Sequence, residues 1–233
     1  MDGLGSFWAE SDAIGRTVVA LLLAMSVSAW VVILWKGWVL QRARRDIARA
    51  VPAFWAAHTL AAGQARLAAL DREQLLLPLL QASTTPDAPG TLASHGHVAS
   101  QLTRRLRDAL HRGLAHLQFG QVLLASVGST APFVGLFGTV WGIYHALVAI
   151  SAAGAISIDK VAGPVGEALV MTAAGLAVAI PAVLAYNLFG QWVAACEAEL
   201  EGFAHDLLEL AQGGASIHPS GDPSTSAAAH PGT

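Results

Sequence analysis

The chain has 233 residues, of which 54% are hydrophobic and only 12% are charged, and its formal net charge is −3. Because soluble globular domains carry about 25% charged residues, this composition excludes an ordinary soluble domain and predicts an integral membrane protein. The small net charge argues against nucleic-acid binding. The single cysteine excludes an internal disulfide and a cysteine cluster for a metal.

The first apolar segment, residues 17–40, carries Trp30, Trp35 and Trp38 towards its C-terminal end. A membrane helix needs about 20 apolar residues, and tryptophans favour the headgroup boundary. Residues 1–16 lack the basic start of a signal peptide, and the apolar run exceeds a signal-peptide core of about 7–15 residues. We therefore expect residues 17–40 to remain as the first transmembrane helix, preceded by a short tail outside the cell membrane.

Most basic residues lie in the next segment, residues 41–120, or at its border. Eleven of the thirteen Lys and Arg residues fall between Lys36 and Arg112. The positive-inside rule places such a segment in the cytoplasm. A linker containing proline and glycine, residues 83–97, interrupts it, and leucines at every fourth position then predict a helix from near Val98. We expect a cytoplasmic helical domain.

The second span follows directly, because residues 113–158 contain no Asp, Glu, Lys or Arg. This run is longer than one membrane crossing requires. We therefore expect a single helix that begins in the cytosol and crosses the membrane within residues 121–151. A short loop outside the membrane, residues 152–160, should follow.

The third span is predicted over residues 161–189. Acidic residues follow in residues 190–212, which we expect to form a cytoplasmic helical tail. The mixture of Gly, Ser, Pro and Ala in residues 213–233 is typical of a disordered C-terminus. The predicted topology therefore has the N-terminus outside, three spans, and the C-terminus in the cytoplasm.

Glu167 is the only charged residue between Lys160 and Glu197. An ionisable group at membrane depth costs roughly 2.5–3.5 kcal/mol on insertion scales, so such groups are rare and mostly functional. A carboxylate there can bind a proton, pair with a charge on a partner, or face water. We interpret Glu167 as the main functional candidate and favour a proton or ion role over purely structural pairing.

Small residues form a stripe along the second span, which allows helix backbones to approach closely in lipid. A helix so rich in glycine would not stand alone in lipid, so we expect a homo-oligomer. The residues assigned to helix packing are Gly135, Gly138, Gly142 and Gly175, together with Pro132 and Pro181.

Two membrane threonines, Thr139 and Thr172, are further candidates. Thr139 can either bond back to its own helix or line a pore and relay a proton. At about 100° per residue, Glu167 and Thr172 lie about 140° apart around an ideal helix, so a straight helix cannot aim both at one axis. Either Pro164 and Gly166 distort the start of the helix, or one of these side chains faces a neighbouring helix.

Other chemistry has little support in the sequence. His145, near the outer end of the second span, is interpreted as a packing or headgroup contact rather than a titrating group. The remaining histidines are scattered, so we expect no metal site and no cofactor. No nucleotide-binding motif or nucleophile–base pair is visible, so we do not expect an enzyme.

Two stretches carry a family resemblance. Residues 129–143, Ser-Thr-Ala-Pro-Phe-Val-Gly-Leu-Phe-Gly-Thr-Val-Trp-Gly-Ile, and residues 166–187, which begin Gly-Glu-Ala-Leu-Val-Met-Thr, resemble the ExbB/TolQ proteins, which are relatives of the flagellar stator protein MotA. One departure precedes Glu167: the family pattern Val-Ala-Pro-Gly-Ile-Ala is here Val-Ala-Gly-Pro-Val-Gly, with the Pro-Gly order inverted.

The resemblance implies an all-α membrane protein whose three transmembrane helices and long cytoplasmic helical extensions form a homo-oligomeric ring, pentameric in this family. It implies a location in the bacterial inner membrane, with residues 1–16 in the periplasm. It also implies a proton-driven motor with a single-span partner of ExbD type. The motor would act on a TonB-like protein that powers siderophore and cobalamin uptake. The family's functional glutamate falls on Glu167, and its two membrane threonines fall on Thr139 and Thr172.

Within the family, the Gly-Pro-Val-Gly-Glu-Ala-Leu variant and the tail at residues 226–231 favour the ExbB type. The short N-terminal tail and His145 suit either TolQ or a short ExbB. The alternative is therefore a TolQ-type subunit, which serves envelope integrity in the Tol-Pal system. A structural scaffold, in which Glu167 only clamps a partner helix, is the alternative from a different class.

Overall fold

The computed structural model describes residues 12–85, 90, 97–152 and 158–215, and the regular secondary structure in this part of the chain is entirely α-helical. Three of the described stretches are long and apolar enough to cross a membrane. The all-helical fold predicted from the sequence is therefore confirmed, and three candidate membrane spans are present as predicted. The helices are α2 (Ala13–Trp55), α3 (Leu60–Leu70), α4 (Leu77–Thr84), α5 (Val98–Gln118), α6 (Gln121–Ala152) and α7 (Ile158–Ala215).

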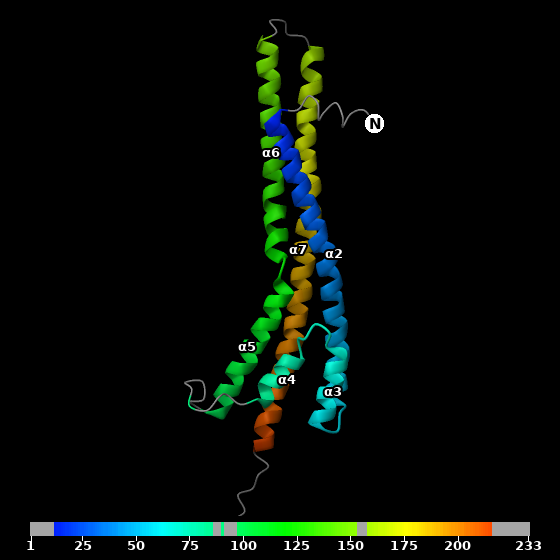
Figure 1. Ribbon diagram of the computed structural model, residues 1–233, viewed down its shortest axis with the longest axis vertical. Helices are drawn as coiled ribbons and strands as arrows, with labels where there is room; N and C mark the ends of the chain where they lie inside the picture. The colour runs from blue at the N-terminus through cyan, green and yellow to red at the C-terminus, as the bar shows by residue number, and fades with distance from the viewer. Residues whose placement is uncertain (1–11, 86–89, 91–96, 153–157, 216–233) are drawn as a thin grey trace, which may run out of the picture.

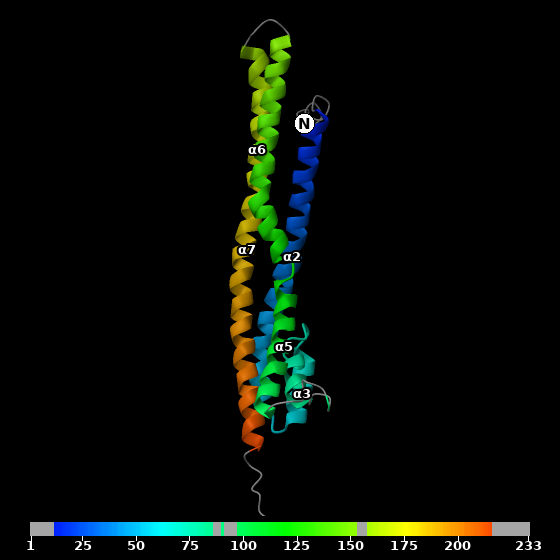
Figure 2. The same cartoon turned by 90° about the vertical axis from the view of Figure 1, so that its left-hand side faces the viewer.

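The molecule is elongated, and α7 runs along most of its length (Figures 1 and 2). In the upper half, α6 and α7 lie antiparallel, and the first part of α2 packs beside them. In the lower half, α3, α4 and α5 gather around the ends of α2 and α7. The upper half contains the predicted membrane spans, and the lower half corresponds to the predicted cytoplasmic domain.

The helices extend beyond the predicted membrane segments. α7 begins at Ile158 and continues to Ala215, so the first residues expected to be disordered, 213–215, are helical. The rest of that tail, residues 216–233, lies outside the described residues, as do residues 153–157 of the predicted outer loop. The helix predicted to resume near Val98 does begin there, as α5.

One prediction about α5 and α6 is wrong. A single helix was expected to run from the cytosol into the membrane, but α5 ends at Gln118 and α6 starts at Gln121. Gly120 has a φ of +84°, a left-handed conformation that favours glycine and commonly ends helices. Its carbonyl oxygen accepts the N–H of Leu124 at 3.2 Å, so α6 begins at once in a new direction. The break was not predicted because residues 113–158 contain no charged residue that would mark it.

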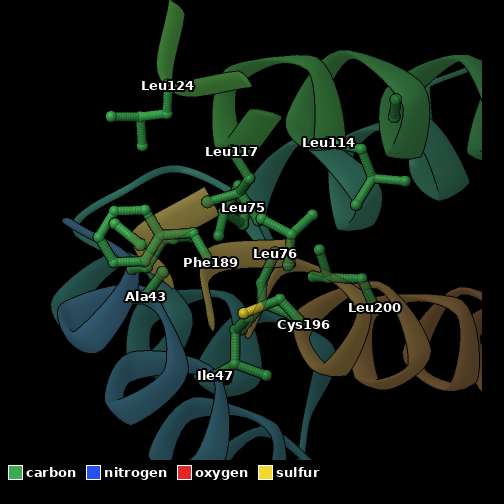
Figure 3. Packing of buried hydrophobic residues seen from close by; sticks show 14 of the residues in the cluster. Ala43, Ile47, Leu75, Leu76, Leu114, Leu117, Leu124, Phe189, Cys196 and Leu200 are labelled. Atoms are coloured by element: carbon green, nitrogen blue, oxygen red, sulfur yellow. The ribbon is translucent and has the colours of Figure 1, made fainter. Parts of the chain in front are cut away.

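The lower half has a conventional hydrophobic core. Leucines from the 75–80 region and from α5 pack against α2 and α7, as Figure 3 shows. Apolar burial contributes roughly 25 cal/mol per Å², which makes it the main stabilising term where helices meet in water. The labelled members of the core are Ala43, Ile47, Leu75, Leu76, Leu114, Leu117, Leu124, Phe189, Cys196 and Leu200.

The upper half is held together differently, by small residues. A Cβ placed on Gly135 would lie 2.6 Å from the carbonyl oxygen of Met171, and one on Gly175 would lie 2.6 Å from that of Ala131. The α6 and α7 backbones therefore touch directly, as expected where lipid removes the hydrophobic driving force between helices. The small-residue stripe of α6 is thus occupied by α7 of the same chain.

Candidate functional site

Glu167 lies in the first part of α7, and its side chain is exposed in the isolated chain. The next residue, Ala168, is buried against α6, where a Cβ on Gly142 would come within 2.9 Å of its own Cβ. This packing fixes the rotation of α7 and leaves Glu167 beside the α6–α7 contact rather than inside it. No ion pair within the described part of the chain involves Glu167.

Thr139 and Thr172 meet across the α6–α7 contact, where their hydroxyl groups are hydrogen-bonded to each other. Thr139 is 7% exposed, and its hydroxyl also donates to the carbonyl oxygen of Gly135 at 3.1 Å. Either hydroxyl can be the donor in the bond between the two threonines. Thr139 thus bonds back to its own helix, which was one of its two alternatives, and the pore-lining alternative stays a prediction.

The angular conflict between Glu167 and Thr172 is resolved by this pairing. Thr172 faces a neighbouring helix, α6, while Glu167 points elsewhere from the same helix. The structure therefore brings Thr139 and Thr172 together within one chain, without Glu167 in direct contact with either.

The predicted packing residues occupy different surroundings. Gly138 lies where three helices meet, because a Cβ there would approach Val18 of α2 and Met171 of α7 at 3.0 and 3.1 Å. Pro132 and Pro181 are both half-buried within continuous helices, so neither ends its helix.

A polar group where the start of α2 meets α6 was not predicted. The Asp12 carboxylate lies 3.6 Å from Nε2 of His145 and accepts a hydrogen bond of 3.4 Å from Nε1 of Trp141. Asp12 also caps the start of α2 by accepting the N–H of Ala13 at 2.6 Å. His145 is thus more than a headgroup contact. The first helix was expected to begin at residue 17 and Asp12 was given no role, so this contact could not be predicted from the sequence.

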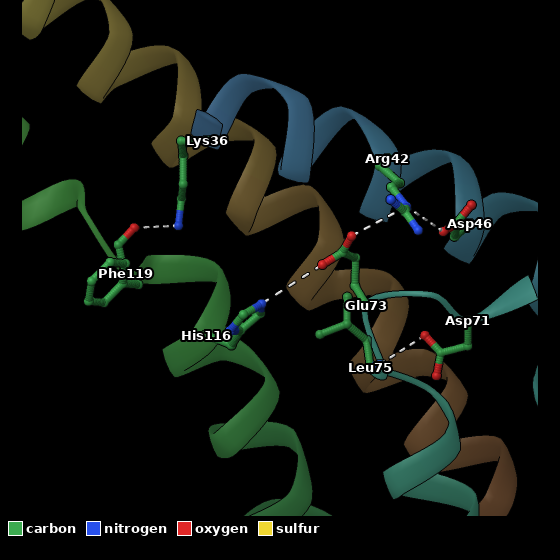
Figure 4. A network of polar contacts seen from close by, with 8 residues as sticks. All are labelled: Lys36, Arg42, Asp46, Asp71, Glu73, Leu75, His116 and Phe119. Atoms are coloured by element: carbon green, nitrogen blue, oxygen red, sulfur yellow. Dashed lines mark hydrogen bonds and ion pairs between the residues drawn. The ribbon is translucent and has the colours of Figure 1, made fainter. Parts of the chain in front are cut away.

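Lys36 was also misjudged, since it was counted with the basic residues that follow the first span. It is fully buried, and its Nζ donates to the carbonyl oxygen of Phe119 at 2.5 Å (Figure 4). That carbonyl is left without a helical partner by the break between α5 and α6. Lys36 therefore ties α2 to the break.

A second group of polar contacts lies near the Lys36–Phe119 pair, as Figure 4 shows. Arg42 of α2 lies 3.4 Å from Glu73, and the other oxygen of Glu73 lies 3.9 Å from Nε2 of His116 in α5. The Asp71 carboxylate accepts the N–H groups of Leu75, Leu76 and Leu77 at 2.7–2.9 Å, which caps the start of α4. These contacts join α2, the 71–76 segment and α5.

No cluster of three or more metal-ligating side chains occurs among the described residues. Cys196 is buried in the lower core, and this burial raises the pKa of its thiol. Because thiolate is the reactive form, Cys196 is suited to packing rather than to redox or nucleophilic chemistry.

The comparisons with known proteins identify a family and several similar proteins. Residues 71–202 match the family described as the MotA/TolQ/ExbB proton channel family. The biopolymer transport protein ExbB of Xanthomonas campestris pv. campestris strain B100 is 41% identical over 213 residues, which cover 88% of this chain and 84% of that protein. ExbB of Neisseria meningitidis strain Z2491 is 39% identical over 202 residues, covering 85% and 92% respectively.

A relative with a different name is less similar. The Tol-Pal system protein TolQ of Haemophilus influenzae is 30% identical over 211 residues, covering 86% of this chain and 90% of that protein. Among these relatives, the proteins named ExbB are thus closer to this chain than the one named TolQ. The TolQ alternative is correspondingly less supported.

Proposed function

Because the chain belongs to the MotA/TolQ/ExbB proton channel family, we propose that it is an inner-membrane subunit of an ExbB-type motor driven by the proton gradient. Glu167 is the proposed proton-linked residue. The observation that carries the proposal is that this carboxylate is exposed on a helix apolar enough to span a membrane, with no ion pair inside the described chain. A bare charge there is costly, so it requires a partner, water or a proton.

In the proposed assembly, a partner protein and a proton meet this requirement of Glu167. Several copies of the chain, a pentamer by analogy with the family, surround a single-span partner of ExbD type that carries its own membrane carboxylate. A proton from the periplasm neutralises a carboxylate near Glu167 and removes its desolvation cost. The partner helix then changes the subunit with which it pairs, and its movement is passed to a TonB-like protein. Siderophore and cobalamin uptake would follow from that work.

The protomer has features suited to a rigid ring subunit. The continuous helix α7 links the membrane half to the lower core, and the Lys36 contact anchors the break between α5 and α6. Thr139 and Thr172, which bond to each other, are proposed to line the pore side of the α6–α7 pair and to exchange partners when the charge on Glu167 changes. In the proposed orientation, the N-terminus is periplasmic and the C-terminus is cytoplasmic.

The test is growth on a siderophore as the sole iron source. A strain without its own ExbB-type protein would receive this chain and its cognate partner, as wild type, Glu167→Gln or Glu199→Gln. Glu199 is an exposed acid on the cytoplasmic part of α7 and serves as the matched control. We expect wild type and Glu199→Gln to restore growth. Glu167→Gln should reach normal membrane levels and bind the partner, yet fail to restore growth.

Full growth with Glu167→Gln would contradict the proton-linked role proposed for Glu167. An assembled wild type that does not restore growth would instead favour the TolQ alternative. Detergent resistance and cell separation in a strain lacking TolQ would then be measured.

A further inference from the structure

A cavity of about 240 Å³ lies between the start of α2, the outer part of α6 and the outer part of α7. Each helix contributes one titratable side chain to its lining: Asp12 from α2, His145 from α6 and Glu167 from α7. Met171 and Gly138 line its deeper end. A cavity of this size with several polar groups has room for a small cluster of water molecules.

The Asp12–His145 pair lies at the outer rim of this cavity. Both side chains are about half exposed, at 47% and 48%, so each lines the cavity and also reaches the surface of the chain. The Trp141 ring lies against His145 with a centroid distance of 4.9 Å, and its N–H holds the Asp12 carboxylate. The imidazole and the carboxylate are thus positioned on α6 and at the start of α2, 3.6 Å apart.

We propose that Asp12 and His145 form a proton-exchange site through which protons pass between the solution outside the membrane and Glu167, by way of water in this cavity. This inference rests on the proposed function, because the Asp12–His145 site would supply protons to the same carboxylate, Glu167. The three titratable side chains of this path all belong to one protomer.

The transfer is balanced in protons and charge. In the proposed step, the imidazole of His145, 3.6 Å from the Asp12 carboxylate, takes a proton from the outer solution. The imidazolium then releases a proton into the cavity water, and the Glu167 carboxylate binds one. His145 ends neutral, Asp12 stays ionised, and Glu167 ends protonated. Histidine suits this step because its charge changes most readily near neutral pH.

The first experiment measures water in the cavity. Met171→Cys and Val170→Cys would be compared in full complexes from which Cys196 has been removed. Met171 lines the cavity, whereas Val170 is exposed on another face of α7 at nearly the same depth. A charged thiosulfonate reagent added from outside should modify Met171→Cys and spare Val170→Cys. Equal modification of both positions, or of neither, would contradict a confined water path.

The second experiment measures proton use. Uptake of a ferric siderophore would be followed between external pH 5.5 and 8 for Asp12→Asn, His145→Gln and the control His205→Gln. Asparagine caps helices as well as aspartate, so Asp12→Asn removes charge and keeps the cap. His205 pairs with Glu209 at 3.3 Å on the far part of α7.

We expect both site variants to assemble normally but to lose about tenfold in uptake rate. This loss is smaller than the roughly 10²–10⁴-fold that a positioned proton-transfer group contributes to a rate, because water still reaches the cavity in these variants. The uptake rates of Asp12→Asn and His145→Gln should depend less on pH than that of His205→Gln. Loss of a purely structural contact would not flatten the pH profile in this way. Unchanged rates and pH profiles, with Glu167→Gln inactive, would refute this inference alone. An active Glu167→Gln would refute the proposed function itself.

Discussion

The direct backbone contact between α6 and α7 makes a sharp prediction for Gly135→Ala. The new Cβ would lie 2.6 Å from the carbonyl oxygen of Met171 and 3.1 Å from the Cα of Gly175. Even a close C–H···O contact keeps carbon and oxygen about 3.3 Å apart, so the helices would have to separate by roughly 0.7 Å. Since both obstructing atoms are backbone, no side chain can turn away to relieve the clash.

The expected loss in stability follows from two opposing terms. Overpacking of a well-packed contact costs about 1–3 kcal/mol. Alanine is more favourable than glycine inside a helix by roughly 0.8–1.0 kcal/mol. The net destabilisation is therefore up to about 2 kcal/mol. In a chain of this size, that corresponds to a fall in unfolding temperature of about 4–8 °C.

The assay is thermal unfolding of the purified protein in one detergent, with Gly202→Ala as the matched control. A Cβ on Gly202 would meet nothing within 4 Å, so this variant keeps only the helix-propensity gain. Its unfolding temperature should rise by about 2–4 °C. If Gly135→Ala were stabilised to the same extent, the argument that α6 and α7 meet backbone to backbone would be wrong.

Two further predictions concern buried polar contacts. Lys36→Ala should destabilise the protein by about 2–4 kcal/mol in thermal unfolding, because it empties a fully buried site and leaves the Phe119 carbonyl without its donor. An unchanged unfolding temperature would contradict this burial. A double-mutant cycle of Thr139→Val and Thr172→Val should give a coupling of about 0.5–1.5 kcal/mol, and strictly additive effects would show that the hydroxyls do not bond.

Several features of the fold were predictable because they depend on local composition. The three spans follow from runs of apolar residues, and the start of α5 at Val98 follows from the spacing of leucines after a linker. The isolation of Glu167 in an apolar segment is likewise visible without any structure. Each of these signals is a property of neighbouring residues along the chain.

Other features could not be predicted in this way. Gly120 resembles the many other glycines of the chain, and only its backbone conformation marks it as the break between α5 and α6. Lys36 resembles the arginines that follow it, yet it is buried because a free carbonyl of Phe119 lies beside it. The approach of Asp12 to His145 joins two distant parts of the chain.

The sequence by itself determined that the chain has three stretches long and apolar enough to cross a membrane, and that one carboxylate, Glu167, interrupts the third, because these properties depend on residue type alone. The tertiary structure decided what each membrane side chain faces. Thr139 meets Thr172, while Glu167 meets a cavity shared with Asp12 and His145. These outcomes depend on the rotation and relative depth of α2, α6 and α7, which are set by packing between residues far apart in sequence.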